Sequence, residues 1–135
     1  MNYQVSPVKK RIFFRVDGDD GQKVGMGHII RMSNLYKNLP KKLKKNHEIF
    51  FLMREYGEGR NYVKKNLGVK IISYNNDFLK KFILKENDIF LFDTLGAEKK
   101  LIKKISQRKI KKVISFDETQ NLNFDKVLIF NGIFF

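Results

Sequence analysis

The fold of this chain is decided by the stretch Val24-Gly25-Met26-Gly27-His28-Ile29-Ile30-Arg31. It comes after a short apolar run, 12–16, and a polar loop, 17–23, and a helical pattern begins where it ends. A strand, a glycine-containing loop and a helix in this order present the unpaired N–H groups of the helix start to an anionic ligand. The order therefore predicts an α/β fold with a ligand site at this helix.

Apolar runs and helical patterns alternate along the rest of the chain. We expect six strands, separated by helices, with a break at Pro40 before a short basic turn and a helix C-cap at Gly68. The strands are expected at 11–16, 48–53, 69–74, 88–93, 111–116 and 126–130, and the main helices at 27–39, 60–67, 77–85 and 98–108. This alternation predicts one Rossmann-like domain, 11-135, after a lead-in, 1-10: a doubly wound, mostly parallel six-stranded sheet of strand order 3-2-1-4-5-6.

Polar residues stand at the ends of several of these strands. Asp17 follows the first strand, Arg54 follows the second, Asp93 ends the fourth, and Asp117 follows the fifth. The carboxyl ends of parallel strands meet at one edge of a sheet, and ligands of such folds bind there, near the point where the strand order reverses. We therefore expect these residues and the glycine stretch to share one rim.

The composition is that of a globular protein and excludes several kinds of site. The chain has no cysteine, which rules out disulfides and thiolate metal sites. Of its two histidines, we expect His47 to be an exposed loop residue, which leaves His28 for chemistry. No apolar run approaches the roughly 20 residues of a membrane-spanning helix, and no signal-type segment precedes Ile12. We therefore expect a cytoplasmic protein without a membrane partner.

The net charge of +14 has two explanations. One is a nucleic-acid partner. The other is genomic base composition, because lysine, isoleucine, asparagine and phenylalanine have A/T-rich codons and dominate the chain, whereas alanine appears once. The lysines are scattered over the helical segments, as on a solvated outer face. We favour base composition, and the charge would still attract anionic ligands.

Two familiar ligand motifs are incomplete. A dinucleotide fingerprint needs a third glycine, where Ile30 stands, and an acidic residue at the end of the second strand, where Arg54 comes first. No Walker A lysine follows the glycines. The acidic turn after Asp17 does not continue as a calcium loop, because its twelfth position is His28 rather than glutamate. We expect neither a dinucleotide nor a metal cofactor.

His28 is the most informative single residue. At the first turn of a helix it lies against the positive end of the helix dipole, which disfavours the imidazolium and favours a neutral base near pH 7. Arg31 comes three residues later on nearly the same face, where it could grip an anion. A histidine that merely hydrogen-bonds the backbone of the helix start fits the same spacing, so the spacing alone leaves both readings open.

Two segments resemble a known family. Phe14-Arg15-Val16-Asp17, followed by the stretch 24–31, resembles the N-terminal signature of the nucleotide-sugar hydrolases of pseudaminic acid biosynthesis and the related SpsG-like spore coat polysaccharide proteins. That signature reads F-R-x-D, a short loop, and I-G-x-G-H-x-x-R. Weaker likenesses continue at 51–54, at Phe92-Asp93 and through 116–131.

The resemblance implies a glycosyltransferase-B architecture and the release of UDP from a diacetamido-trideoxyhexose. His28 would activate or position the attacking water, without an obligatory metal. General-base help of this kind contributes about 10²–10⁴-fold. The residues implied in substrate binding are Arg15, Asp17, Gly25, Gly27, Arg31, Arg54 and Asp93.

The sequence departs from the family in two respects. Thr94 to Gly96 stand where the family has a tyrosine shortly after the fourth-strand aspartate. The family's second domain, which carries most of the nucleotide-diphosphate contacts, has no counterpart in these 135 residues. The resemblance thus predicts the N-terminal half of an enzyme: a fragment, the first half of a split gene completed by a separate chain, or a decayed copy. We expect little or no hydrolysis from this half alone.

Two other functions remain open on the sequence. A sugar transferase would keep the fold and the glycine loop but pass the sugar to an acceptor. A basic, non-enzymatic module would bind nucleic acid or an anionic glycan through the lysines and would not depend on His28.

Overall fold

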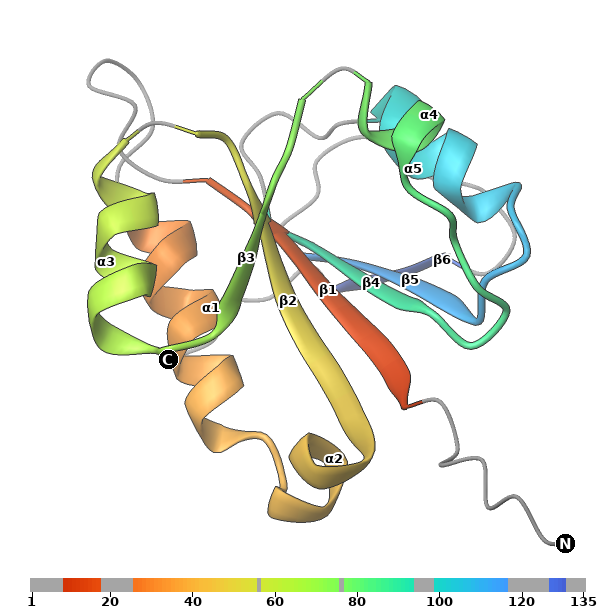
Figure 1. Ribbon diagram of the computed structural model, residues 1–135. Helices are drawn as coiled ribbons and strands as arrows, with labels where there is room; N and C mark the ends of the chain where they lie inside the picture. Colours follow the sequence, from red (N-terminus) through yellow and green to blue (C-terminus); the bar gives the residue numbers. More distant parts are fainter. Residues whose placement is uncertain are drawn as a thin grey trace, which may run out of the picture.

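Six parallel strands form a single sheet in the order β3-β2-β1-β4-β5-β6 (Figure 1). This computed structural model describes residues 9–17, 26–55, 57–75, 77–93, 99–116 and 127–130, with the backbone alone at 99 and 127–130. The strands are β1 (Lys10–Val16), β2 (His47–Met53), β3 (Lys70–Ser73), β4 (Ile89–Asp93), β5 (Lys112–Phe116) and β6 (Val127–Phe130). The predicted Rossmann-like sheet and its strand order are confirmed, and β1 begins one residue inside the expected lead-in.

The helices cover the sheet from both sides. On one side lie α1 (Gly27–Asn38), α2 (Lys41–Asn46) and α3 (Glu58–Asn66), and on the other lie α4 (Phe78–Lys81) and α5 (Lys99–Ser106). Figure 1 shows α1 and α3 to the left of the sheet and α4 and α5 at the upper right. The switch from one side to the other comes at the β3-to-β4 crossover, as right-handed connections in this strand order require.

Two apolar cores result from the alternation of side chains along the central strand. Phe14 of β1 packs with Ile29 of α1 and Val63 of α3, whereas its neighbour Phe13 packs with Phe90 of β4 and Ile102 of α5. All six side chains are fully buried. Because both faces are covered, β1 is apolar at consecutive positions rather than at alternate ones.

Local signals in the sequence set the ends of two helices. The helix α1 stops at Asn38, just before Pro40, which lacks the N–H needed to continue it. Gly68 follows α3 with φ +62°, the left-handed conformation that glycine adopts without strain. Both predicted stops are confirmed.

The predicted helix at 77–85 is too long. The structure has a single turn, α4, after which the chain is extended from Phe82. The backbone beyond α4 is held by side chains instead: Arg11 of the distant strand β1 donates to the Ile83 carbonyl oxygen at 2.9 Å, and the Lys85 N–H donates to the nearby Asp88 carboxylate at 2.7 Å. These bonds replace the helical ones that the sequence pattern predicted.

The expectation for His47 is also wrong. It is the first residue of β2, not a loop residue, and its side chain is partly buried. Its Nδ1 lies 2.9 Å from the Leu43 carbonyl oxygen, so the ring closes the end of α2.

Within the residues that the structure describes, no helix combines the length and the apolar character needed to cross a membrane.

Candidate active site at the carboxyl edge of the sheet

His28 meets the carboxylate of Asp93 at the carboxyl edge of the sheet. Asp93 is the last residue of β4 and pairs in register with Val16 at the end of β1, while His28 lies in the first turn of α1. The His28 Nδ1 is 2.6 Å from Asp93 Oδ1, and the Asp93 side chain is fully buried. Two segments 65 residues apart in sequence are thereby joined at one site.

The same carboxylate is held by Arg31, one turn later on α1. Its Nε donates to Asp93 Oδ2 at 2.7 Å, and its Nη2 donates to Oδ1. A buried carboxylate is costly unless it is paired and its lone pairs are used. Arg31 supplies the opposite charge in a two-pronged geometry, so Asp93 accepts from both α1 side chains at once.

The hydrogen bond to Asp93 decides the tautomer of His28. An ionised carboxylate can only accept, so Nδ1 must carry a proton, and in the neutral imidazole Nε2 then keeps its lone pair. Arg31 Nη2 also lies 3.4 Å from Nδ1, but the 2.6 Å carboxylate contact is the stronger of the two. The His28 side chain is 16% exposed, so the ring remains accessible to a small reactant.

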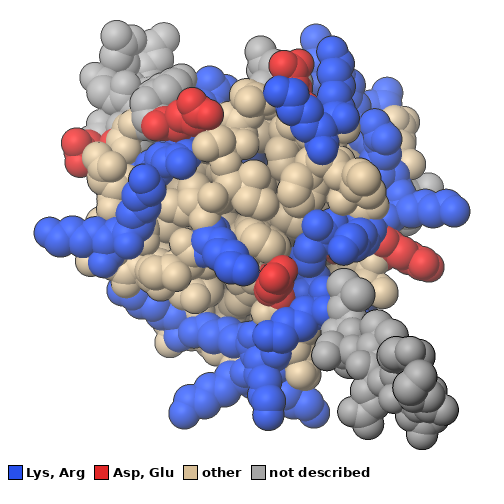
Figure 2. All heavy atoms as spheres, viewed as in Figure 1, with Lys and Arg blue, Asp and Glu red and all other residues tan. Residues whose placement is uncertain are grey.

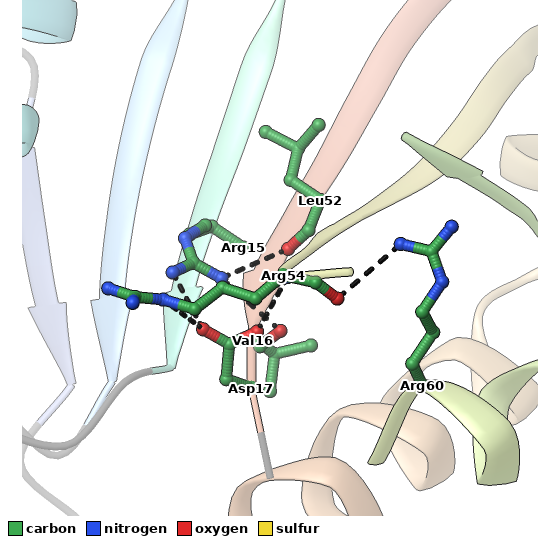
Figure 3. Close-up of polar contacts among 6 residues, drawn as sticks. All are labelled: Arg15, Val16, Asp17, Leu52, Arg54 and Arg60. Atoms are coloured by element: carbon green, nitrogen blue, oxygen red, sulfur yellow. Dashed lines mark hydrogen bonds and ion pairs between the residues drawn. The ribbon is translucent and has the colours of Figure 1, made fainter. Parts of the chain in front are cut away.

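A second polar cluster lies on the same edge, on the side of the sheet that carries α4. Arg15 of β1 is buried, and its Nη2 pairs with Asp17 Oδ2 at 2.7 Å (Figure 3). Its Nη1 donates to the carbonyl oxygens of Leu52 at 3.2 Å and Val16 at 3.4 Å. The guanidinium also lies over the ring of Tyr74, 4.0 Å from its centroid. The buried charge is thus compensated on every side.

Arg54 approaches the same carboxylate from β2. Its backbone N–H donates to Asp17 Oδ1 at 3.0 Å, and its Nε is 3.4 Å from Asp17 Oδ2 (Figure 3). Two guanidinium groups therefore share one carboxylate, and the three groups together carry a net positive charge. The Arg54 side chain is half exposed, unlike that of Arg15. This positive, partly open cluster suits an anionic or hydroxyl-rich ligand.

The structure thus groups most of the predicted site residues on one rim. Gly27 is the first residue of α1, and a Cβ built on it meets nothing within 4 Å, so the helix start is open. Gly25 lies outside the described residues. Arg31, expected to face an anion, binds Asp93 in the structure, and Asp93, expected to face substrate, binds His28.

Two residues at this edge were not singled out from the sequence. Tyr74 follows β3 and stacks on Arg15, while Arg60 of α3 donates to the Arg54 carbonyl oxygen at 3.4 Å and to Ser73 Oγ at 3.2 Å. The strand-end rule that pointed to Arg54 applies equally to Tyr74. Arg60 gives no such signal, because its place depends on how α3 packs.

Among the described residues, no group of three or more histidine and acidic side chains is placed to hold a metal ion.

Comparison with known proteins gives two relatives. The chain is 32% identical over 120 residues to the spore coat polysaccharide biosynthesis protein SpsG of Bacillus subtilis. The matched segment covers 86% of this chain and 34% of SpsG. The similarity supports a place for this chain in the SpsG-like family. The chain is also 35% identical over 103 residues to the uncharacterized protein MJ1062 of Methanocaldococcus jannaschii, covering 73% of this chain and 20% of that protein.

The chain therefore spans about a third of the length of SpsG and a fifth of that of MJ1062. No protein-family model matches the chain. No solved structure matches it either.

Proposed function

We propose that this chain provides the His28 side of a nucleotide-sugar hydrolase active site in surface polysaccharide biosynthesis. The substrate would be a UDP-linked diacetamido-trideoxyhexose, and the products UDP and the free sugar. The observation that carries the proposal is the contact of 2.6 Å between His28 Nδ1 and the buried Asp93 carboxylate, which leaves Nε2 as the basic nitrogen. The similarity to a polysaccharide biosynthesis protein supports the same pathway class.

In the proposed reaction, His28 Nε2 accepts a proton from water as the water oxygen forms a bond to the anomeric carbon. The bond from that carbon to the phosphate oxygen breaks, and UDP leaves with the electron pair. The imidazolium formed at His28 is stabilised by Asp93, which is already within hydrogen-bonding distance. Arg31 holds Asp93 in this orientation, which makes it a positioning residue rather than a catalytic one.

The second cluster would bind the sugar side of the substrate. Arg15 is fixed by Asp17 and Tyr74, so it contributes charge and rigidity, and the half-exposed Arg54 is placed to meet ligand oxygens. The two clusters flank the end of β1, which brings a base and an anion-binding group to one rim. The remaining contacts, those to the nucleotide diphosphate, would come from a second domain that these residues do not contain.

UDP release from the UDP-linked sugar tests the proposal. We expect little or no release by the 135-residue chain alone. A chimera that joins this chain to the part of SpsG outside the matching third should restore it. His28→Ala should then lower kcat by about 10²–10⁴-fold. Chimera turnover that survives His28→Ala would contradict the role of His28.

An assay with an added sugar acceptor distinguishes the hydrolase from a sugar transferase of the same fold. The products are analysed with and without an added sugar acceptor, and the proposal expects free sugar in both cases. Accumulation of glycosylated acceptor at the expense of free sugar would instead identify a transferase.

A further inference from the structure

A groove between α4 and α5 shares Tyr74 with the proposed site and is otherwise not used by the proposed reaction. It has a volume of about 660 Å³ and lies on the side of the sheet opposite α1 and α3. The crossover from β3 to β4 that forms one wall of the groove contains the four-residue helix α4 and then an extended segment.

The floor of the groove is apolar and incompletely covered. Phe78 of α4 is buried there, and Leu79, Leu101 and Tyr74 beside it are only partly buried. Partly buried aliphatic and aromatic side chains gain free energy if an apolar surface covers them, at about 25 cal/mol per Å². A ligand that interacts by charge alone would leave these apolar side chains exposed to water.

The rim of the groove is basic. Lys100, Lys104 and Arg108 follow one another at intervals of four residues along α5 and its end, and Lys80 faces them from α4. Helical spacing places Lys100 and Lys104 on one face of α5, about 6 Å apart along its axis, and Arg108 follows just beyond the end of the helix at Ser106. Asp77 lies 3.9 Å from Lys80, and among the described residues that line the groove none is acidic. Figure 2 shows lysine and arginine side chains gathered at the upper right, over α4 and α5.

We infer that this groove is a docking site for an acidic amphipathic helix of a partner protein. Such a helix would lay its apolar face on Phe78, Leu79 and Leu101 and set glutamate or aspartate side chains, also about 6 Å apart at every fourth residue, against the lysines. It would thereby complete the helix layer that α4 leaves short. A nucleic acid would satisfy the lysines but not the apolar floor, which is why a helix is favoured.

Peptide binding to the full chain tests this inference. The probe is a labelled helical peptide of about four turns, with leucine along one face and glutamate beside it. A scrambled peptide of the same composition keeps the charge but loses the apolar face, and a single-stranded RNA serves as a competing polyanion. We expect the amphipathic peptide to bind at least about tenfold more tightly than the scrambled one.

Matched variants locate the binding surface. Lys100→Glu with Lys104→Glu should weaken binding of the peptide at least about tenfold, because attraction becomes repulsion at the rim. Lys64→Glu with Lys65→Glu, on the exposed face of α3, makes the same change in net charge and should alter binding by less than about twofold. Leu101→Ser should weaken peptide binding and leave RNA binding unchanged, and Leu79→Ser serves as a second variant of the apolar floor. The circular dichroism spectrum of each variant checks that it is folded.

Equal binding of the two peptides, or equal loss with both lysine pairs, would overturn the inference in favour of diffuse electrostatic attraction. RNA that binds in the groove more tightly than the amphipathic peptide would assign the surface to nucleic acid instead. Neither result depends on hydrolase activity, so the outcome is separate from that of the proposed function.

Discussion

His28 and Asp93 form the pair on which the chemistry of the site depends. The dipole argument predicts a neutral imidazole at the helix start, but it does not say which nitrogen keeps the proton. Asp93 settles this by accepting at Nδ1, and Arg31 supplies the charge that makes a buried carboxylate tolerable. Each residue of the group thus has a distinct role, although only His28 would touch the reactants.

The tautomer of His28 can be observed directly. We expect nitrogen-15 spectra of the neutral His28 ring to show a protonated Nδ1 and an unprotonated Nε2. Asp93→Ala should return His28 to the tautomer mixture of an imidazole in water. His47 bonds the Leu43 carbonyl oxygen and should keep its spectrum, which makes it an internal control. A His28 signal that does not respond to Asp93→Ala would contradict the assignment.

At the scale of elements, α1 and α4 show when local signals are enough. The helix α1 has a regular apolar stripe, with Ile29 and Met32 buried, and Pro40 lies two residues beyond its end. The region of α4 has a helical composition as well, but Arg11 and Asp88 hold its backbone in an extended form. Arg11 of the distant strand β1 and the nearby Asp88 therefore override helix propensity after α4, whereas α1 follows its local signals.

The end of α3 gives a stability prediction at this scale. Gly68→Ala should destabilise the protein by about 1–2 kcal/mol, because alanine resists the left-handed conformation at φ +62°. A Cβ at this position meets nothing within 4 Å, so the cost comes from the backbone alone. Gly27→Ala also enters open space, in a helix and without a positive φ, and should cause no loss. Urea denaturation of both variants gives the comparison, and equal effects would argue against this account.

The whole molecule is a sheet with a separate apolar core on each face. On the α4 and α5 face the core is built largely from phenylalanines: Phe13 lies between Phe50 and Phe90, with ring centroids 5.3 Å and 4.7 Å away. These rings come from three neighbouring strands, so they hold the centre of the sheet together on that side. This core accounts for part of the high phenylalanine content of the chain.

Removing one of these rings should destabilise the whole protein. Phe90→Ala is expected to cost about 3–5 kcal/mol, because Phe90 is fully buried and the cavity cannot close in a packed sheet. That is a large share of the 5–15 kcal/mol typical of a domain. Ile83→Ala removes an apolar side chain that is 80% exposed and should change stability by less than about 0.5 kcal/mol. Thermal unfolding of both variants tests the difference, and a Phe90→Ala protein as stable as the Ile83→Ala protein would refute it.

The sequence predicted the fold more completely than the site. Apolar runs at the right spacing gave the strands, their order and most helix ends, because these depend on local periodicity and on the right-handedness of the crossovers. The strand-end rule placed Arg54 and Asp93 on the rim, but it assigned both to the substrate. It did not predict that Asp93 would instead be hydrogen-bonded to His28 and Arg31, because these contacts depend on how α1 is rotated against β4.

What the sequence by itself determined is the α/β sheet, the position of the start of α1 at its carboxyl edge and the presence of a histidine there. Hydrophobic periodicity and backbone chemistry act over a few residues, so they can be read along the chain. What only the tertiary structure decided is the pairing of His28 with a carboxylate 65 residues away, the burial of Arg15 beneath Tyr74 and the shortening of α4. Each of these depends on a contact between segments far apart in the sequence: His28 with Asp93, Arg15 with Tyr74, and Arg11 with the Ile83 carbonyl oxygen. Local sequence patterns do not encode such contacts, because they form only when the distant segments pack together.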